Sequence, residues 1–295
     1  MVKGDTGKYI PFWVTVCAAL IGFHAMFGRA IDIFFNAKEE DMTFGALVPL
    51  FSIYLLWEDR KAIAESLGKP SIAGFIATLP CLALAFIGAR GLQLRLEQLG
   101  FIGLCIALPW AFFGWRTAKR CAFPAAYLLF TIPLATFLDV VTIHLRLLAS
   151  STALGVLNGF GISAVQQGTA IYATGSVPFS IDVAEPCSGL RSLFALMALT
   201  AAYARLYQPT WTRRAILFAF SVPLAVIGNV VRIVSICLVS AAFGHEFGTG
   251  FYHDYSGYIV FIVAILLMLA VSEIIDRLFD RRRQRAAKAG KGGAE

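Results

Sequence analysis

Long apolar runs separated by short charged segments dominate the pattern of hydrophobic and polar positions along the chain. A transmembrane helix needs about 20 mainly apolar residues, within a range of about 17–25, and eight runs reach or approach that length. Prolines inside several runs are compatible with this interpretation, because neighbouring helices can satisfy the backbone groups that a proline frees. The pattern predicts an all-α polytopic membrane protein with about eight transmembrane helices, at Pro11–Gly28, Thr43–Trp57, Ile72–Ala89, Leu99–Trp115, Ala122–Val141, Cys187–Tyr207, Ala215–Phe243 and Tyr255–Ile275.

One connection between these runs, Thr142–Pro186, is much longer than the others. Its first part, Val140–Leu157, mixes apolar residues with a histidine and an arginine, which predicts a helix lying on the membrane surface. Its second part, Ala170–Val183, alternates loosely around a glycine and a proline, which predicts a short β-hairpin. The chain shows no internal repeat, so we expect one membrane domain over residues 1–275 and a basic, disordered tail over 276–295.

Composition and charge support a membrane protein and predict its topology. Hydrophobic residues make up 58% of the chain and charged residues only 15%, whereas a soluble domain is about 25% charged. When Lys and Arg are counted over alternating loops, one side holds 18 and the other five, while Arg191 and Arg232 fall inside predicted spans. Because cytoplasmic loops are richer in Lys and Arg, both termini are expected in the cytoplasm, and the basic tail indicates that side rather than nucleic-acid binding.

Cysteine and histidine spacing does not indicate a metal site. None of the six cysteines forms a CxxC pair, which argues against both a zinc site and a disulfide scaffold. His245 and Glu246 resemble the start of an HExxH zinc motif, but the position of the second histidine is occupied by Thr249, so the match is poor. We expect no metal and no cofactor.

Two arginines inside predicted spans need a specific explanation, because a charge in the membrane is costly and usually faces the protein interior or a water-filled cavity. Arg191 follows Cys187 by four residues, so both lie on one helical face. Arg232 precedes the outer end of its predicted span by about 11 residues, or roughly 16 Å, and Asn229 lies on the same face.

Cys187 differs from the other cysteines because it lies in the first predicted helical turn, directly after Pro186. A helix N-terminus and a nearby cation both favour thiolate over thiol. The predicted topology brings His253, followed by Asp254, to the same outer face, where a histidine can move a proton and an arginine can stabilise an oxyanion. Each residue alone has an ordinary explanation in packing, helix pairing or solvation; their combination indicates a thiol enzyme.

Three separated blocks carry a family resemblance: EPCSGLRS at 185–192, NVVR at 229–232, and the segment ending in His253 with Gly257 just beyond. In this order they resemble the exosortase/archaeosortase family of membrane transpeptidase-like enzymes. The resemblance implies a catalytic set of Cys187, Arg232 and His253, with cleavage through a Cys thioester. Accessory or substrate-binding roles are expected for Arg191, Asn229, Asp254, Ser188 and Gly189. The roles of Arg191 and Arg232 are interchangeable at this stage.

The resemblance also implies partners and a location. Its substrates are exported proteins whose C-terminal sorting tail comprises a short motif, a transmembrane helix and a basic cluster. An acceptor nucleophile of unknown identity, linked to extracellular polysaccharide production, resolves the thioester. The expected location is the cytoplasmic (inner) membrane of a prokaryote, with the lipid bilayer as a partner and the active site on the outer, periplasmic face.

Other functions remain open from the residues alone. A transporter of an anionic substrate would use Arg191 and Arg232 along its pathway and would not need the Cys187 thiol. A membrane acyltransferase would share the nucleophile but take its acyl group from lipid. A structural scaffold leaves the arginines inside the spans unexplained.

Overall fold

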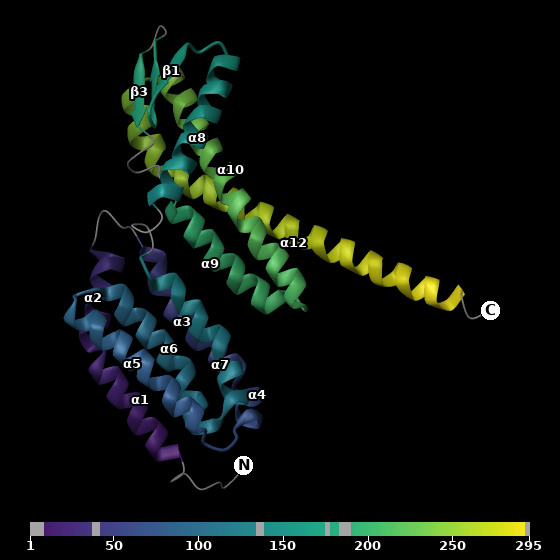
Figure 1. Ribbon diagram of the computed structural model, residues 1–295. Helices are drawn as coiled ribbons and strands as arrows, with labels where there is room; N and C mark the ends of the chain where they lie inside the picture. Colours follow the sequence, from purple (N-terminus) through teal and green to yellow (C-terminus); the bar gives the residue numbers. More distant parts are fainter. Residues whose placement is uncertain (1–8, 37–41, 134–138, 175–177, 183–189, 293–295) are drawn as a thin grey trace. The chain divides into compact units, whose positions relative to one another are not determined.

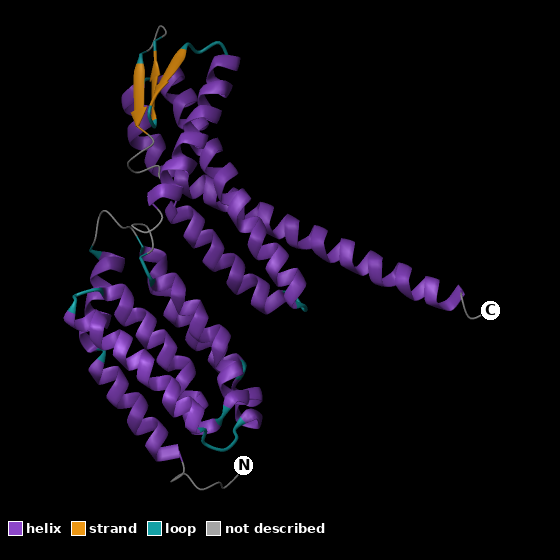
Figure 2. Ribbon diagram, viewed as in Figure 1, coloured by secondary structure: helices purple, strands orange, loops and turns teal. Residues whose placement is uncertain are grey.

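The computed structural model describes residues 9–36, 42–133, 139–174, 178–182 and 190–292. Their regular structure is almost entirely helical, with one small sheet (Figures 1 and 2). The chain divides into two compact units, Met1–Leu134 and Ala135–Glu295.

The first unit begins with a broken helix. α1 (Ile10–Gly22) and α2 (His24–Phe35) meet at an angle of 55°. The unit continues with the 3₁₀ turn η2 (Thr43–Ala46), α3 (Leu47–Glu58), α4 (Arg60–Ser66), α5 (Ile72–Arg90), α6 (Leu94–Phe113), α7 (Trp115–Tyr127) and the 3₁₀ turn η3 (Leu128–Thr131).

Helices α5 and α6 form an antiparallel hairpin whose close approach depends on small residues. A Cβ atom added to Gly100 of α6 would lie 2.7 Å from the Cβ of Ala85 on α5, and one added to Gly74 would collide with the backbone of Ala111. Glycine and alanine at a helix interface let the two backbones approach closely, which is the usual basis of helix association in lipid.

The second unit is organised around α10 (Trp211–Phe243). Its 33 residues span about 50 Å, compared with a hydrocarbon core of about 30 Å. The unit consists of α8 (Asp139–Gly159), β1 (Ala164–Gln167), β2 (Ala170–Ala173), β3 (Phe179–Asp182), α9 (Leu190–Tyr207), α10, α11 (His245–Phe247), the π-helical turn η5 (Gly248–Tyr252) and α12 (His253–Gly292).

The two ends of α10 have different neighbours. Towards its N-terminal end α10 packs with α9 and α12, around Ala204, Leu217 and Met268. Its C-terminal part is covered by α8 and the sheet, which we call the cap (Figure 2). The cap core includes Ala149, Ala153 and Leu157 of α8, Ile171, Phe179 and Ile181 of the strands, and Ile233, Ile236 and Cys237 of α10.

The sheet is antiparallel, with strand order β1-β2-β3. Strands β2 and β3, paired from Ala170↔Asp182 to Ala173↔Phe179, occupy the segment for which the sequence predicts a hairpin. Strand β1 is additional, and pairs with β2 through a tight turn at Gly168. The φ of Gly168 is +62°, a conformation that glycine adopts without the cost that a Cβ atom would impose.

Fewer helices have spanning length than the sequence pattern predicts. Among the described residues, α5, α6, α10 and the Tyr255–Arg281 part of α12 are long and apolar enough to cross a membrane, and α1 with α2 makes a fifth if the bent pair crosses as one. The predicted span Ala122–Val141 is not one helix, because α7 ends at Tyr127 and η3 at Thr131. Ile132 then turns extended (ψ 125°) before a proline, as residues preceding proline tend to do.

The basic C-terminal segment, expected to be disordered, continues as helix α12 as far as Gly292. Its alanine, arginine, glutamine and lysine residues have high helix propensity. An ion pair of 2.7 Å between Arg277 and Glu273, one turn apart, adds a modest stabilisation of the exposed helix surface.

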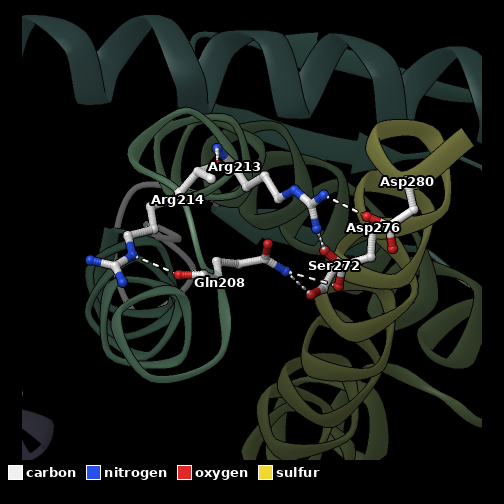
Figure 3. A network of polar contacts seen from close by, with 7 residues as sticks. Gln208, Arg213, Arg214, Ser272, Asp276 and Asp280 are labelled. Atoms are coloured by element: carbon white, nitrogen blue, oxygen red, sulfur yellow. Dashed lines mark hydrogen bonds and ion pairs between the residues drawn. The ribbon is translucent and has the colours of Figure 1, made fainter. Parts of the chain in front are cut away.

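A polar network ties α12 to the start of α10 (Figure 3). Arg213, only 5% exposed, forms ion pairs with Asp276 at 2.8 Å and with Asp280 at 2.7 Å. The buried Gln208 donates from Nε2 to Ser272 Oγ at 2.8 Å and to Asp276 Oδ2 at 3.2 Å. This network, which we call the clamp, joins the α9–α10 connection to α12.

Candidate active site

The described residues cover only part of the predicted catalytic set. Cys187, Ser188 and Gly189 lie outside them. Arg191 and Asp254 belong to the first turns of α9 and α12, but their side chains are likewise outside the description. The site is therefore built from the three remaining predicted residues, Asn229, Arg232 and His253.

Arg232 and His253 are brought together although they lie on different helices. The Nη2 of Arg232 on α10 donates to the backbone oxygen of His253, the first residue of α12, at 3.3 Å. The Nε of Arg232 donates to Ser256 Oγ at 3.2 Å, and Ser256 Oγ in turn donates to the His253 oxygen at 2.9 Å. These three contacts fix the guanidinium against the first turn of α12.

The turn between α10 and α12 explains how this register arises. Gly244 ends α10 with a φ of +97°, a left-handed conformation that favours glycine. The chain then returns through α11 and the π-helical turn η5, a type of turn that is frequent at functional sites. Gly248 of η5 approaches Ser240 of α10 too closely to accommodate a Cβ atom, so the returning chain lies directly against α10.

Sequence reasoning missed Ser256 and gave Gly257 no role in the site. Ser256 is only 1% exposed and accepts from Arg232 while lying one turn from His253. A Cβ atom added to Gly257 would lie 3.4 Å from the guanidinium carbon of Arg232, so the glycine leaves room for the arginine. The i+3 spacing from His253 was the signal that the sequence carried for Ser256, whereas Gly257 was part of the third family block.

A small cavity of about 30 Å³ adjoins Arg232 between α9, α10 and α12. Its polar lining comes from Ser192, Asn229 and Arg232, and the rest of its wall is apolar. A cavity of this size holds a water molecule when polar partners are available. The buried Oδ1 of Asn229 has no hydrogen-bond partner among the described residues, so it can accept from a bound group.

The cavity also constrains Cys187. Ser192 lines it from the first turns of α9, and Cys187 precedes Ser192 by five residues. Five residues span at most about 18 Å when fully extended. The covalent chain therefore keeps the Cα atom of Cys187 within about 18 Å of that of Ser192.

The position of Arg232 along α10 can be compared with the thickness of a membrane. Arg232 lies 21 residues after Trp211 on α10, or about 32 Å along the helix axis, close to the full thickness of a hydrocarbon core of about 30 Å. We call Trp211–Arg232 the membrane-length part of α10. Beyond it, Ile233, Ile236 and Cys237 are buried beneath α8 and the sheet.

The chemical capacity of this arrangement follows from the arginine. A guanidinium has five N–H donors, and the described contacts use two of them, at Nε and Nη2, both to neutral acceptors. The remaining donors and the positive charge can bind a carboxylate or stabilise an oxyanion.

The comparisons with known proteins identify the family. The family model of the transmembrane exosortases matches residues 36–270, which include α9, α10 and the start of α12. No curated protein and no solved structure gives a significant match. Because the matched residues cover most of the chain and contain all three blocks around Cys187, Arg232 and His253, the chain belongs to the transmembrane exosortase family, whose general role is that of a membrane transpeptidase or protease.

Proposed function

We propose that this protein is a cysteine protease or transpeptidase that cleaves the C-terminal sorting tail of exported proteins. The tail would comprise a short motif, a transmembrane helix and a basic cluster. The single observation that carries the proposal is the link from Arg232 through Ser256 to His253, beside a cavity that Ser192 lines only five residues from Cys187.

In the proposed reaction the Cys187 thiolate attacks the scissile carbonyl carbon, and a C–S bond forms. Arg232 stabilises the resulting oxyanion. His253 gives a proton to the leaving amine as the C–N bond breaks, which leaves a thioester on Cys187. Water or an acceptor nucleophile then attacks the thioester, losing a proton to His253, and the thiolate is regenerated.

Four other residues have supporting roles in this proposal. Arg191 follows Cys187 by four residues and either stabilises the thiolate or binds an acidic residue of the motif. Asn229 faces the cavity beside Arg232 and positions a bound group. Ser188 and Gly189 adjoin the nucleophile and contact substrate, while Asp254 orients His253.

The proposed location is the inner membrane of a prokaryote, with both termini in the cytoplasm and the site on the outer face. The Lys and Arg distribution supports this orientation. A substrate tail that spans the bilayer would present its scissile bond where the membrane-length part of α10 ends. The acceptor that resolves the thioester would be a component linked to extracellular polysaccharide.

The test is processing of a tailed substrate in cells that carry wild-type protein or the Cys187→Ala variant. The new C-terminus would be identified by mass spectrometry, and hydroxylamine would be added to trap the thioester as a hydroxamate. We expect cleavage and trapping to disappear in Cys187→Ala but to persist in Cys17→Ala, a control that alters an exposed cysteine of α1. Cleavage that survives in a well-expressed Cys187→Ala variant would reject the thiol mechanism and favour a transporter.

A further inference from the structure

The first unit contains a large apolar groove that the proposed reaction does not use. Its volume is about 680 Å³, and its walls come from α1, α3, α6 and α7 together with the end of α4. The lining is overwhelmingly apolar and rich in aromatic rings, including Phe12, Trp13, Phe101 and Phe113. The groove extends along α6 from Phe101 to Phe113, or about 18 Å.

One end of the groove is positively charged. Ile63, Leu67, Phe113 and Thr117 line this end, where the α4–α5 and α6–α7 connections meet through the hydrogen bond from Gly68 N to Phe113 O at 2.9 Å. Residues 58–69 and 115–120 hold six Lys or Arg and three Asp or Glu, a net charge of +3. The six basic residues are all exposed: Arg60, Lys61, Lys69, Arg116, Lys119 and Arg120.

The dimensions of the groove suit an acyl chain. Its volume of about 680 Å³ lies in the range of about 300–1,000 Å³ that is typical of small-molecule sites. The 18 Å length also matches one leaflet, about half of the 30 Å hydrocarbon core.

We infer that the first unit binds an anionic phospholipid, with an acyl chain in the groove and the phosphate at the basic end. Arg116, Lys119 and Arg120 are the headgroup candidates on α7, because they are exposed in the first turns of the helix at this end of the groove. Arg60 of α4 shares a helical face with Ile63 and Leu67 and adds a fourth cation. The site is independent of the thiol chemistry, since none of these residues belongs to the proposed catalytic set.

The experiment uses the full-length protein, stripped of lipid in detergent and incubated with vesicles of phosphatidylglycerol or phosphatidylcholine that carry the same acyl chains. Lipid that remains bound after repurification is counted per protein by native mass spectrometry. We expect about one phosphatidylglycerol per chain and much less phosphatidylcholine. The preference should fall by roughly fivefold for each cation removed, and should vanish in an Arg116→Gln, Lys119→Gln, Arg120→Gln triple variant.

Two further variants separate the groove from general surface charge. Ile53→Trp adds bulk to a groove residue that is 63% exposed, so it should block binding of both lipids without disturbing buried packing. The control is a triple variant of α12 that removes the same charge, Arg277→Gln with Arg281→Gln and Arg285→Gln. It should leave the bound lipid in place. Equal retention of both lipids by the wild type, or unchanged binding in Ile53→Trp, would overturn the inference, while tail processing in the same preparations tests the thiol mechanism separately.

Discussion

Two arginines on α10 have opposite surroundings, although both reach across to α12. Arg213 is held by two carboxylates, Asp276 and Asp280. Arg232, 19 residues further along, is held within the described residues by the hydroxyl of Ser256 and the backbone oxygen of His253. Carboxylates neutralise a guanidinium, whereas neutral acceptors orient it and leave its charge in place. The first arrangement therefore serves cohesion, and the second leaves the charge for a ligand.

The local geometry strengthens this contrast. The clamp fills its space with Gln208, Ser272 and the ring of Phe279, which lies 5.1 Å from the Arg213 guanidinium. The Arg232 end borders a cavity of about 30 Å³ and an uncrowded glycine, Gly257. An arginine within a membrane-length helix therefore does not by itself mark a catalytic site; its partners decide which role is possible.

The largest effect is expected from Arg232→Lys. Lysine keeps the charge but lacks the planar set of donors that contacts Ser256 and His253 together. Tail cleavage should slow by about 100–1,000-fold, as for the loss of an oxyanion donor, while the thermal midpoint stays within about 4 °C. The matched control is Arg213→Lys, which should lower the midpoint and leave the activity per folded molecule unchanged. A loss of stability in Arg232→Lys together with a loss of activity in Arg213→Lys would refute the assignment of these roles.

The clamp itself can be divided by its two carboxylates. Asp276 accepts from both Arg213 and Gln208 and its side chain is 36% exposed, whereas Asp280 is 60% exposed. Asp276→Asn should lower the free energy of unfolding by about 1–3 kcal/mol, and Asp280→Asn by less than about 1 kcal/mol because water screens it. Denaturant unfolding in detergent measures both. Equal losses of unfolding free energy in the two variants would mean that burial does not determine how much each carboxylate stabilises the clamp.

Gly257 tests the space around Arg232. Gly257→Leu should displace the guanidinium, with a cost of about 1–3 kcal/mol that appears as slower tail cleavage. Gly257→Ala is the control, because its Cβ would make an ordinary contact 3.4 Å from the guanidinium carbon. If alanine reduces cleavage as strongly as leucine, backbone flexibility rather than space is the property that matters.

The smallest effect is expected from Ser256→Ala, which removes one neutral partner of Arg232. A loss of about 1 kcal/mol corresponds to roughly a fivefold lower kcat for cleavage, with KM unchanged. If Ser256 acts by positioning Arg232, the substitution should cause no further loss in the Arg232→Lys background. Additive losses in the double variant would show that Ser256 acts elsewhere.

How much was predictable differs between the helices and the site. Apolar runs located α5, α6 and α10 because twenty apolar residues in sequence have few alternatives to a membrane or a core. The apolar runs did not reveal the bend between α1 and α2. Nor did they reveal that the helical structure following α7 ends at Thr131. Strand β1 (AVQQ) has only two apolar residues followed by two glutamines, so its pattern is not distinctive. The sequence predicted Arg232 and His253 in one site, whereas the described contact joins the Arg232 guanidinium to the backbone oxygen of His253. Ser256 was missed because a serine carries no signal until its partner is known.

The sequence by itself determined the membrane class, the family through its three blocks, and the candidate residues for the proposed chemistry, because these depend on composition, local spacing and side-chain type. Only the tertiary structure decided what surrounds them. The apolar run Val230–Phe243 reads the same whether lipid or protein covers it, yet Ile233, Ile236 and Cys237 are buried beneath α8 and the sheet. Hydrophobicity records that a side chain avoids water, whereas packing determines what takes the place of water.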